Sequence, residues 1–158
     1  MPNKSIVFQF ISEPTDVNYG GNVHGGSVMK WIDQAGYACA SAWSGSYAVT
    51  VYVGGIRFYK PIKIGQIVKV EAHVIYTGST SMHIAINVFS RNLKSFEFEK
   101  KTHCIIVFVA VDDDGKSVKV PKWVPETEEE KQQEIYAKKL VELRKQIEDE
   151  MKPFFTRS

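Results

Sequence analysis

Apolar and polar residues alternate along most of this chain, which is the pattern of β-strands that bury one face. In the longest of these alternating runs, the pair Gly54-Gly55 predicts a bulge or a close approach of the backbone. Segments rich in glycine, proline, asparagine or aspartate separate the runs and predict turns. The predicted strands are residues 5–13, 47–60, 66–77, 81–91 and 98–111.

One long segment, residues 26–42, follows a helical period instead. Its apolar residues, among them Val28, Ile32 and Cys39, recur at spacings of three or four positions. The opposite face of this helix is also mostly apolar, so we expect the helix to be wrapped on nearly all sides. One central helix with five strands predicts an α+β fold built on an antiparallel sheet.

The end of the chain differs from the rest. Thr127 and Glu130 have the spacing of a capping box and predict the start of a second helix. The apolar residues of this helix are only loosely periodic, so we favour a charged helix lying on the domain surface. Contact with a neighbouring chain is the alternative. The sequence is therefore divided into a domain of residues 1–124 and a helical extension of residues 125–158.

Composition narrows the class of protein. The chain has 158 residues, 44% of them hydrophobic, which suits one domain with a packed core. It contains no apolar run of the ~18–20 residues that cross a bilayer and no export signal, so we predict a cytoplasmic protein without membrane contact. Cys39 and Cys104 lie in apolar stretches and are expected to be reduced core thiols. A net charge of +2 is too small to indicate nucleic acid.

The segment between Asn18 and Asp33 holds the candidate chemistry. Asp33 is the single acidic residue between Asp16 and Glu71, and it lies on the mostly apolar helix. A carboxylate in such a place is costly unless it is paired or functional. The Gly25-Gly26 pair precedes the helix, where free backbone N–H groups can bind an anion or stabilise an oxyanion. A tight turn is the plainer interpretation of the two glycines.

Helix geometry separates these two features. Seven residues between Gly26 and Asp33 correspond to roughly 10 Å at the helical rise. A general base and an oxyanion donor must each lie within about 3 Å of neighbouring reacting atoms. Two antiparallel copies of the chain would satisfy this requirement, so the sequence suggests a site shared across a dimer.

The same segment resembles a known motif. Its pattern, N-x-x-G-N-V-H-G-G-x-x-M/L-K-x-x-D, is similar to that of the hotdog-fold acyl-CoA thioesterases, in particular the cytosolic long-chain acyl-CoA hydrolases and their bacterial relatives. The stretches AVTVYVGGIRFYKPIKIGQIV, GSTSM and VPKWVPETEEEKQQ also resemble that family. The matching positions of the motif are Asn18, Gly21, Asn22, Val23, His24, Gly25, Gly26, Met29, Lys30 and Asp33.

The resemblance implies a hotdog fold, in which a five- to six-stranded antiparallel sheet wraps a long central helix, here followed by a C-terminal helix. It implies homodimers with the site at their interface, often assembled as trimers of dimers. Acyl-CoA would be hydrolysed to a fatty acid and coenzyme A without a metal or a separate cofactor. Asp33 would act as general base or nucleophile, while Asn18 and the Gly25–Gly26 backbone of the partner would orient water and polarise the thioester.

The resemblance also suggests substrate contacts. His24 would touch the substrate or simply pack at the helix start. Gly54 stands where relatives carry an acidic or bulkier residue, which leaves the acyl chain preference open. Basic residues near the turn at Pro61 would meet the phosphates of coenzyme A, although at least half of them are better interpreted as ordinary surface cations. The candidate substrate-binding residues are His24, Gly54, Arg57, Lys60, Ser79, Thr80 and Ser81.

Two other functions of the same fold match the sequence less well. Hotdog dehydratases pair a histidine with a helix acid behind a Pro-Gly entry, whereas this chain has asparagine and Gly-Gly. A non-catalytic acyl-CoA-binding regulator would need a DNA-binding segment, and none is recognised. Ser27, His24 and Asp33 cannot converge as a triad from one helix. The strand histidines show no spacing of metal ligands, so we predict no metal.

Overall fold

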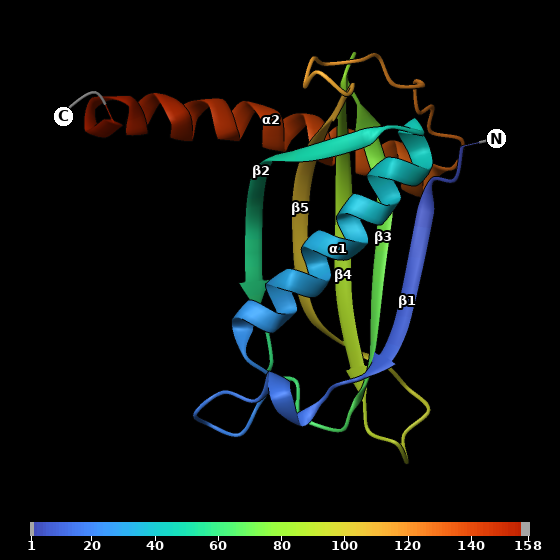
Figure 1. The fold of residues 1–158 in the computed structure, drawn as a ribbon, viewed down its shortest axis with the longest axis vertical. Coiled ribbons are helices and arrows are strands. Elements are labelled where there is room, and N and C mark those ends of the chain that lie inside the picture. Colours follow the sequence, from blue (N-terminus) through green and yellow to red (C-terminus); the bar gives the residue numbers. More distant parts are fainter. Residues whose placement is uncertain (1, 156–158) are drawn as a thin grey trace.

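A five-stranded antiparallel sheet with one long helix on each face forms the protein (Figure 1). The structure is a computed structural model that describes residues 2–155. The strands lie in the order β1-β3-β4-β5-β2, so β1 and β2 are the two edges. Along the chain the elements are β1 (Ser5–Ile11), the 3-10 turn η1 (Pro14–Asp16), α1 (Gly25–Ser44), β2 (Tyr47–Phe58), β3 (Ile67–Thr77), β4 (Ser81–Arg91), β5 (Glu99–Val111) and α2 (Glu128–Phe155).

Helix α1 packs on the inner face of the sheet and forms the main core with it. Its ends are set locally: His24 is the N-cap, and Gly45 ends the helix with a left-handed φ of 69°. The helix approaches β5 closely at Gly36, where a Cβ atom would lie 2.8 Å from the ring of Phe108. The predicted central helix and the five strands are confirmed.

Strand β2 is bent twice, because its register against β5 shifts between Thr50 and Tyr52 and again between Gly54 and Arg57. Gly55 has a φ of 68°, a conformation that favours glycine. The bulge predicted from the Gly-Gly pair is therefore confirmed. Thr50 lies before both shifts and shares with Ala48 the side of the sheet that faces α1. After the first shift, Tyr52 lies on the opposite side, in a cavity under α2.

Helix α2 lies on the outer face of the sheet. The predicted capping box is present: the Thr127 hydroxyl accepts from the Glu130 amide at 3.1 Å, and the Glu130 carboxylate accepts from the Thr127 amide at 3.3 Å. Ala137 and Leu140 pack on Ile75 and Ile105 in a second, smaller cluster. The last turns of α2 extend beyond the edge of the sheet (Figure 1).

The expectation that α1 is wrapped on nearly all sides is wrong for the single chain. The sheet covers only the face that carries Val28, Ile32 and Ala35. The opposite face stays open, with Met29 47% and Tyr37 37% exposed. A sheet that twists around one side of a helix leaves the other side for a second partner. Among the described helices, none is long and apolar enough to cross a membrane.

Candidate active site

Asp33 lies on the open face of α1, near the middle of the helix. Its Oδ1 atom accepts a hydrogen bond of 3.0 Å from the Thr50 hydroxyl on β2. Large apolar side chains of α1 and β2 are exposed in the single chain. They are Met29 and Tyr37, one helical turn on either side of Asp33, and Tyr47, Val51 and Val53 on the strand that carries Thr50. A carboxylate fixed inside an exposed apolar surface is the arrangement expected where a second protein surface completes a site.

Asn18 organises the loop between η1 and α1. Its side-chain Oδ1 accepts from the amides of Gly20 at 2.8 Å and Asn22 at 3.0 Å, while its backbone amide donates to the Asn22 carbonyl. The side-chain carbonyl is therefore used within the loop. The amide nitrogen of Asn18 is the end that can donate to a substrate carbonyl or to water.

The two glycines at the start of α1 have different roles. The Gly26 amide donates to His24 Nδ1 at 2.8 Å, so it is already engaged by the N-cap side chain. The Gly25 amide has no hydrogen-bond partner among residues 2–155. Gly25 is consequently the available backbone donor, and the predicted contribution of Gly26 would require His24 to rotate away. Of the two roles expected for His24, the structure of the single chain shows the one at the helix start, where its side chain caps α1.

A cavity of about 340 Å³ opens beside this helix start. Asn18, Gly25, Phe58 and Lys60 are among the residues that line it. Lys101 also lines the cavity although it is 7% exposed, and its Nζ atom lies 3.4 Å from Glu99 Oε2. Lys60 forms an ion pair with the same Glu99 carboxylate. One acidic group thus faces two cations, which leaves an excess of positive charge at the rim.

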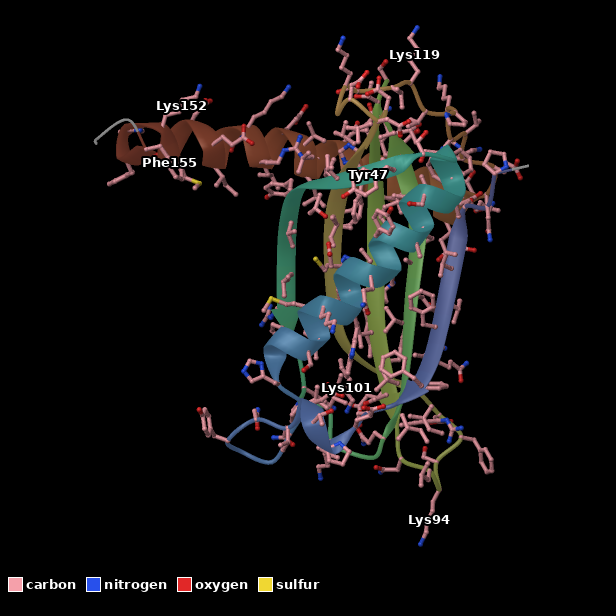
Figure 2. The ribbon with its side chains drawn as sticks, viewed as in Figure 1. Tyr47, Lys94, Lys101, Lys119, Lys152 and Phe155 are labelled. Carbon is pink, nitrogen blue, oxygen red and sulfur yellow. The ribbon has the colours of Figure 1, made fainter. Side chains whose placement is uncertain are left out.

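Two separate groups of candidate residues result. Gly25 lies against Phe58 at the end of β2, whereas Asp33 is bonded to Thr50 nearer the beginning of that strand. Figure 2 shows the same separation, with Lys101 and Tyr47 toward opposite ends of the sheet. Because Gly26 and Asp33 belong to one continuous helix, the spacing of roughly 10 Å along the helix axis applies. A single chain does not bring the two groups together.

The remaining predicted substrate contacts are dispersed. Gly54 lines a cavity under α2 on the outer face, away from Asp33 and Thr50. Arg57 lies 5.7 Å from the ring centroid of Tyr59. The turn that contains Ser79, Thr80 and Ser81 lies at the end of the sheet where β2 begins, because Ser81 is level with Val109 and Val49. Arg57 is next to the cavity beside Asn18, because Phe58 and Thr102 line that cavity and Thr102 donates to the Arg57 carbonyl. Gly54 and the Ser79–Ser81 turn do not line it.

Thiol chemistry does not fit either group of residues. Burial raises the pKa of Cys39 and of Cys104 to about 12, so both are inert core thiols at neutral pH. Within residues 2–155 no cluster of three or more histidine, cysteine or acidic side chains has a geometry that would hold a metal ion.

Sequence reasoning missed Thr50 and Lys101. A threonine in the run YAVTVYV is an ordinary strand residue, and only the packing of β2 beside α1 reveals its bond to Asp33. In the sequence, the adjacent lysines Lys100 and Lys101 are typical of a solvated surface, yet Lys101 is buried in the wall of the cavity. Neither contact has a local sequence signal, because both depend on register between distant segments.

Comparison with known proteins agrees with this architecture. The family model described as the thioesterase superfamily matches residues 20–96. The acyl-CoA thioester hydrolase YciA of Salmonella typhimurium is 32% identical over 123 residues, which cover 76% of this chain and 92% of that protein. A hexameric acyl-CoA thioesterase in its apo form superposes with a TM-score of 0.86 at 32% identity, over 90% of this chain and 91% of that one.

A third similar structure is the acyl-CoA hydrolase of Staphylococcus aureus in complex with butyryl coenzyme A, coenzyme A and coenzyme A disulfide. It has a TM-score of 0.88 and 30% identity over 96% of this chain and 92% of its own. Variants of that hydrolase with an asparagine, an aspartate or a threonine replaced by alanine have also been solved. The chain belongs to the thioesterase superfamily, and the predicted hotdog fold is confirmed.

Proposed function

We propose that the protein hydrolyses acyl-CoA thioesters to a free fatty acid and coenzyme A. The observation that carries this proposal is the Asp33 carboxylate, which Thr50 holds on an exposed apolar surface. The relatives named above are acyl-CoA hydrolases with the same fold. The activity of these relatives and the geometry of this chain support the same chemistry.

Asp33 either activates the water that attacks the thioester carbonyl or attacks that carbonyl itself. Acting as general base, it removes a proton from water, whose oxygen then bonds to the carbonyl carbon. The tetrahedral intermediate collapses with cleavage of the C–S bond, and the thiolate of coenzyme A receives the proton. Direct attack by Asp33 would instead break the C–S bond, release the coenzyme A thiolate and give a transient anhydride. Water then hydrolyses this anhydride to the fatty acid and the Asp33 carboxylate, and the thiolate takes up the proton that is released. The Thr50 hydroxyl fixes the carboxylate in either route by holding Oδ1.

The developing oxyanion needs donors that the Asp33 surface does not supply. Asn18, through its side-chain amide, and Gly25, through its backbone amide, are the donors at the other group of residues. We infer that they come from a second copy of the chain. A homodimer that pairs along β2 would place the α1 helices side by side, so that each Asp33 faces the partner's helix start.

The positions of these three residues support the assignment. In the Staphylococcus aureus hydrolase, the intervals between the replaced asparagine, aspartate and threonine are the same as those between Asn18, Asp33 and Thr50 in this chain. The cationic side chains of Lys60 and Lys101 line the same cavity as Asn18 and suit the phosphates of coenzyme A. Ser79, Thr80 and Ser81 would approach this cavity only from the partner.

Assembly and location follow the same inference. We propose that the dimers associate further as trimers of dimers, since similar structures include hexameric thioesterases. We expect the enzyme to work in the cytoplasm. Coenzyme A enters as part of the substrate, and the proposed reaction uses no separate cofactor.

Replacement of Asp33 tests the reaction. We expect Asp33→Ala to lower the turnover of palmitoyl-CoA by about 10²–10⁴-fold, the usual contribution of a general base, with the oligomer unchanged by size-exclusion chromatography. Glu71→Ala is the matched control, because Glu71 is a carboxylate on β3 that pairs with Lys69. A near-wild-type rate for the Asp33 variant would exclude the assignment. Released thiol, measured across acyl chains from acetyl to stearoyl, identifies the preferred substrate.

A further inference from the structure

Helix α2 spans the entire width of the sheet. Glu130, near its first turn, bonds to Lys4 beside the β1 edge at 2.9 Å. The guanidinium of Arg144 lies 4.8 Å from the ring centroid of Tyr52 on β2, the opposite edge. The intervening helix is about 21 Å long, and four strand spacings measure about 19 Å. The helix therefore crosses the strands nearly at right angles and reaches the β2 edge at Arg144.

Residues 145–155, here called the overhang, continue past that edge. They add about 16 Å of helix, and Figure 1 shows them projecting beyond β2. Phe155 marks the far end of the described helix (Figure 2). In the single chain the overhang leaves Ile147 52% and Phe154 75% exposed.

The apolar face of the overhang continues the face of α2 that packs on the sheet. The positions that follow one another along it are spaced alternately by three and four residues, which keeps them on one side of the helix. Where α2 crosses the sheet, Ala137 is fully buried. Ile147 still borders the strands at the β2 edge, and beyond it the stripe is exposed, with Met151 42% and Phe154 75% exposed. Its members are Ala137, Leu140, Arg144, Ile147, Met151 and Phe154.

We propose that the overhang packs on the outer face of a second copy of this chain, joined to the first along β2. The proposal rests on the dimer of the proposed function. Two antiparallel edge strands are related by a two-fold axis normal to the sheet, so both α2 helices lie on the same face of the joined sheet. About 16 Å corresponds to three strand spacings, which extends the overhang over the partner's β2, β5 and β4.

The receiving surface has the matching chemistry. On the outer face beside the β2 edge, a cavity of about 200 Å³ lies between α2 and the strands. Tyr52, Ile105 and Val107 from the strands line it together with Leu143 and Ile147 of α2. The other face of the overhang carries Lys145 and Asp149, which would remain in solvent.

Photo-crosslinking identifies the surface that the overhang touches. Phe154 is replaced by benzoylphenylalanine, and this protein is mixed with isotopically heavy subunits of natural sequence and allowed to exchange. We expect heavy–light crosslinked peptides from β2, β4, β5 or α2. Crosslinks confined to one chain, or intersubunit crosslinks to the α1 face, would overturn the proposal.

Matched double variants measure the contribution of the stripe. The first variant combines Ile147→Gln with Met151→Gln and so makes the apolar stripe polar. The control combines Lys145→Gln with Asp149→Gln on the opposite face of the helix, and glutamine is a good helix former in both. The first pair should raise the subunit concentration at which the oligomer dissociates at least tenfold in sedimentation experiments, and the second should not. Equal effects would contradict the proposal. An inactive protein that still forms the crosslinks would refute the proposed function alone, whereas an active one without them would refute only this contact.

Discussion

Gly36 decides how closely α1 can approach the sheet. A Cβ atom there would lie 2.8 Å from the ring of Phe108, which is buried beneath the helix. Overpacking of this kind typically costs about 1–3 kcal/mol, whereas Gly→Ala within a helix gains about 1 kcal/mol. We expect Gly36→Ala to lower the midpoint of urea unfolding. Gln34→Ala, at an exposed position of the same helix, is the control, and a raised midpoint for the Gly36 variant would contradict the packing argument.

Single residues also show which parts of the candidate site the sequence can suggest. Asp33 and Gly25 are candidates from the sequence alone, because a lone carboxylate within an apolar helix and a glycine pair at the start of that helix are both unusual. The sequence does not show which of the two glycine amides is free to donate, because the rotamer of His24 decides whether the Gly26 amide is engaged. Thr50 lies seventeen positions after Asp33, and only the fold makes them neighbours.

At the scale of elements, α2 covers three histidines on the outer face of the sheet, and its docking should depend on pH. Burial lowers the pKa of His73, His83 and His103, and burial together with the positive charge of Arg144 lowers that of His83 to about 4. The folded state thus prefers neutral imidazoles. Its stability is complete above the unfolded pKa of about 6.5 and falls as the pH drops from there toward 4.

His83 alone contributes roughly 3 kcal/mol to this loss. Urea unfolding between pH 7 and pH 4.5 measures the effect, and His83→Gln should make the free energy of unfolding less dependent on pH. The groups around these rings include Tyr76 beside His83, and Asn87 and Tyr136 bonded to His103. A stability that does not change over this range would show that the histidines are solvated.

The elements differ in how well the sequence predicts them. Each strand was found because alternation reports one buried face directly, and the Gly-Gly bulge in β2 was found because only glycine takes its backbone conformation easily. The sequence pattern did not predict which face of α2 packs on the sheet. Arg144 interrupts its stripe and Ala137 is small, so the three-four spacing is hidden among charged residues.

For the whole molecule, the open face of α1 and the projecting end of α2 lie on the two sides of the same β2 edge. Both features expose apolar side chains that a single chain leaves without a partner. A second copy paired along β2 would cover both at once. The proposed dimer would explain why the sequence overestimates the wrapping of α1, because apolar positions do not distinguish contacts within a chain from contacts between chains.

A shared site makes a quantitative prediction about mixed subunits. Asn18→Ala and Asp33→Ala each inactivate a different contributor, so each variant alone should be inactive. In a mixed dimer, one site combines both defects and the other combines both intact residues. Random exchange at equal amounts makes about half of the dimers mixed, which should restore about a quarter of the wild-type activity. The assay follows thiol release from palmitoyl-CoA, after mass spectrometry has verified subunit exchange.

The alternative of a site within one chain predicts a different result for the same mixture. Both subunits would then keep their own defect, and exchange would restore no activity. Mixing Asp33→Ala with Thr50→Ala is the matched control, because these two residues are bonded within one chain and serve the same site. Exchange between them leaves each site with one of the two defects, so this mixture should do no better than the average of its separate variants. Recovery in the first mixture alone therefore assigns Asn18 and Asp33 to opposite sides of the dimer.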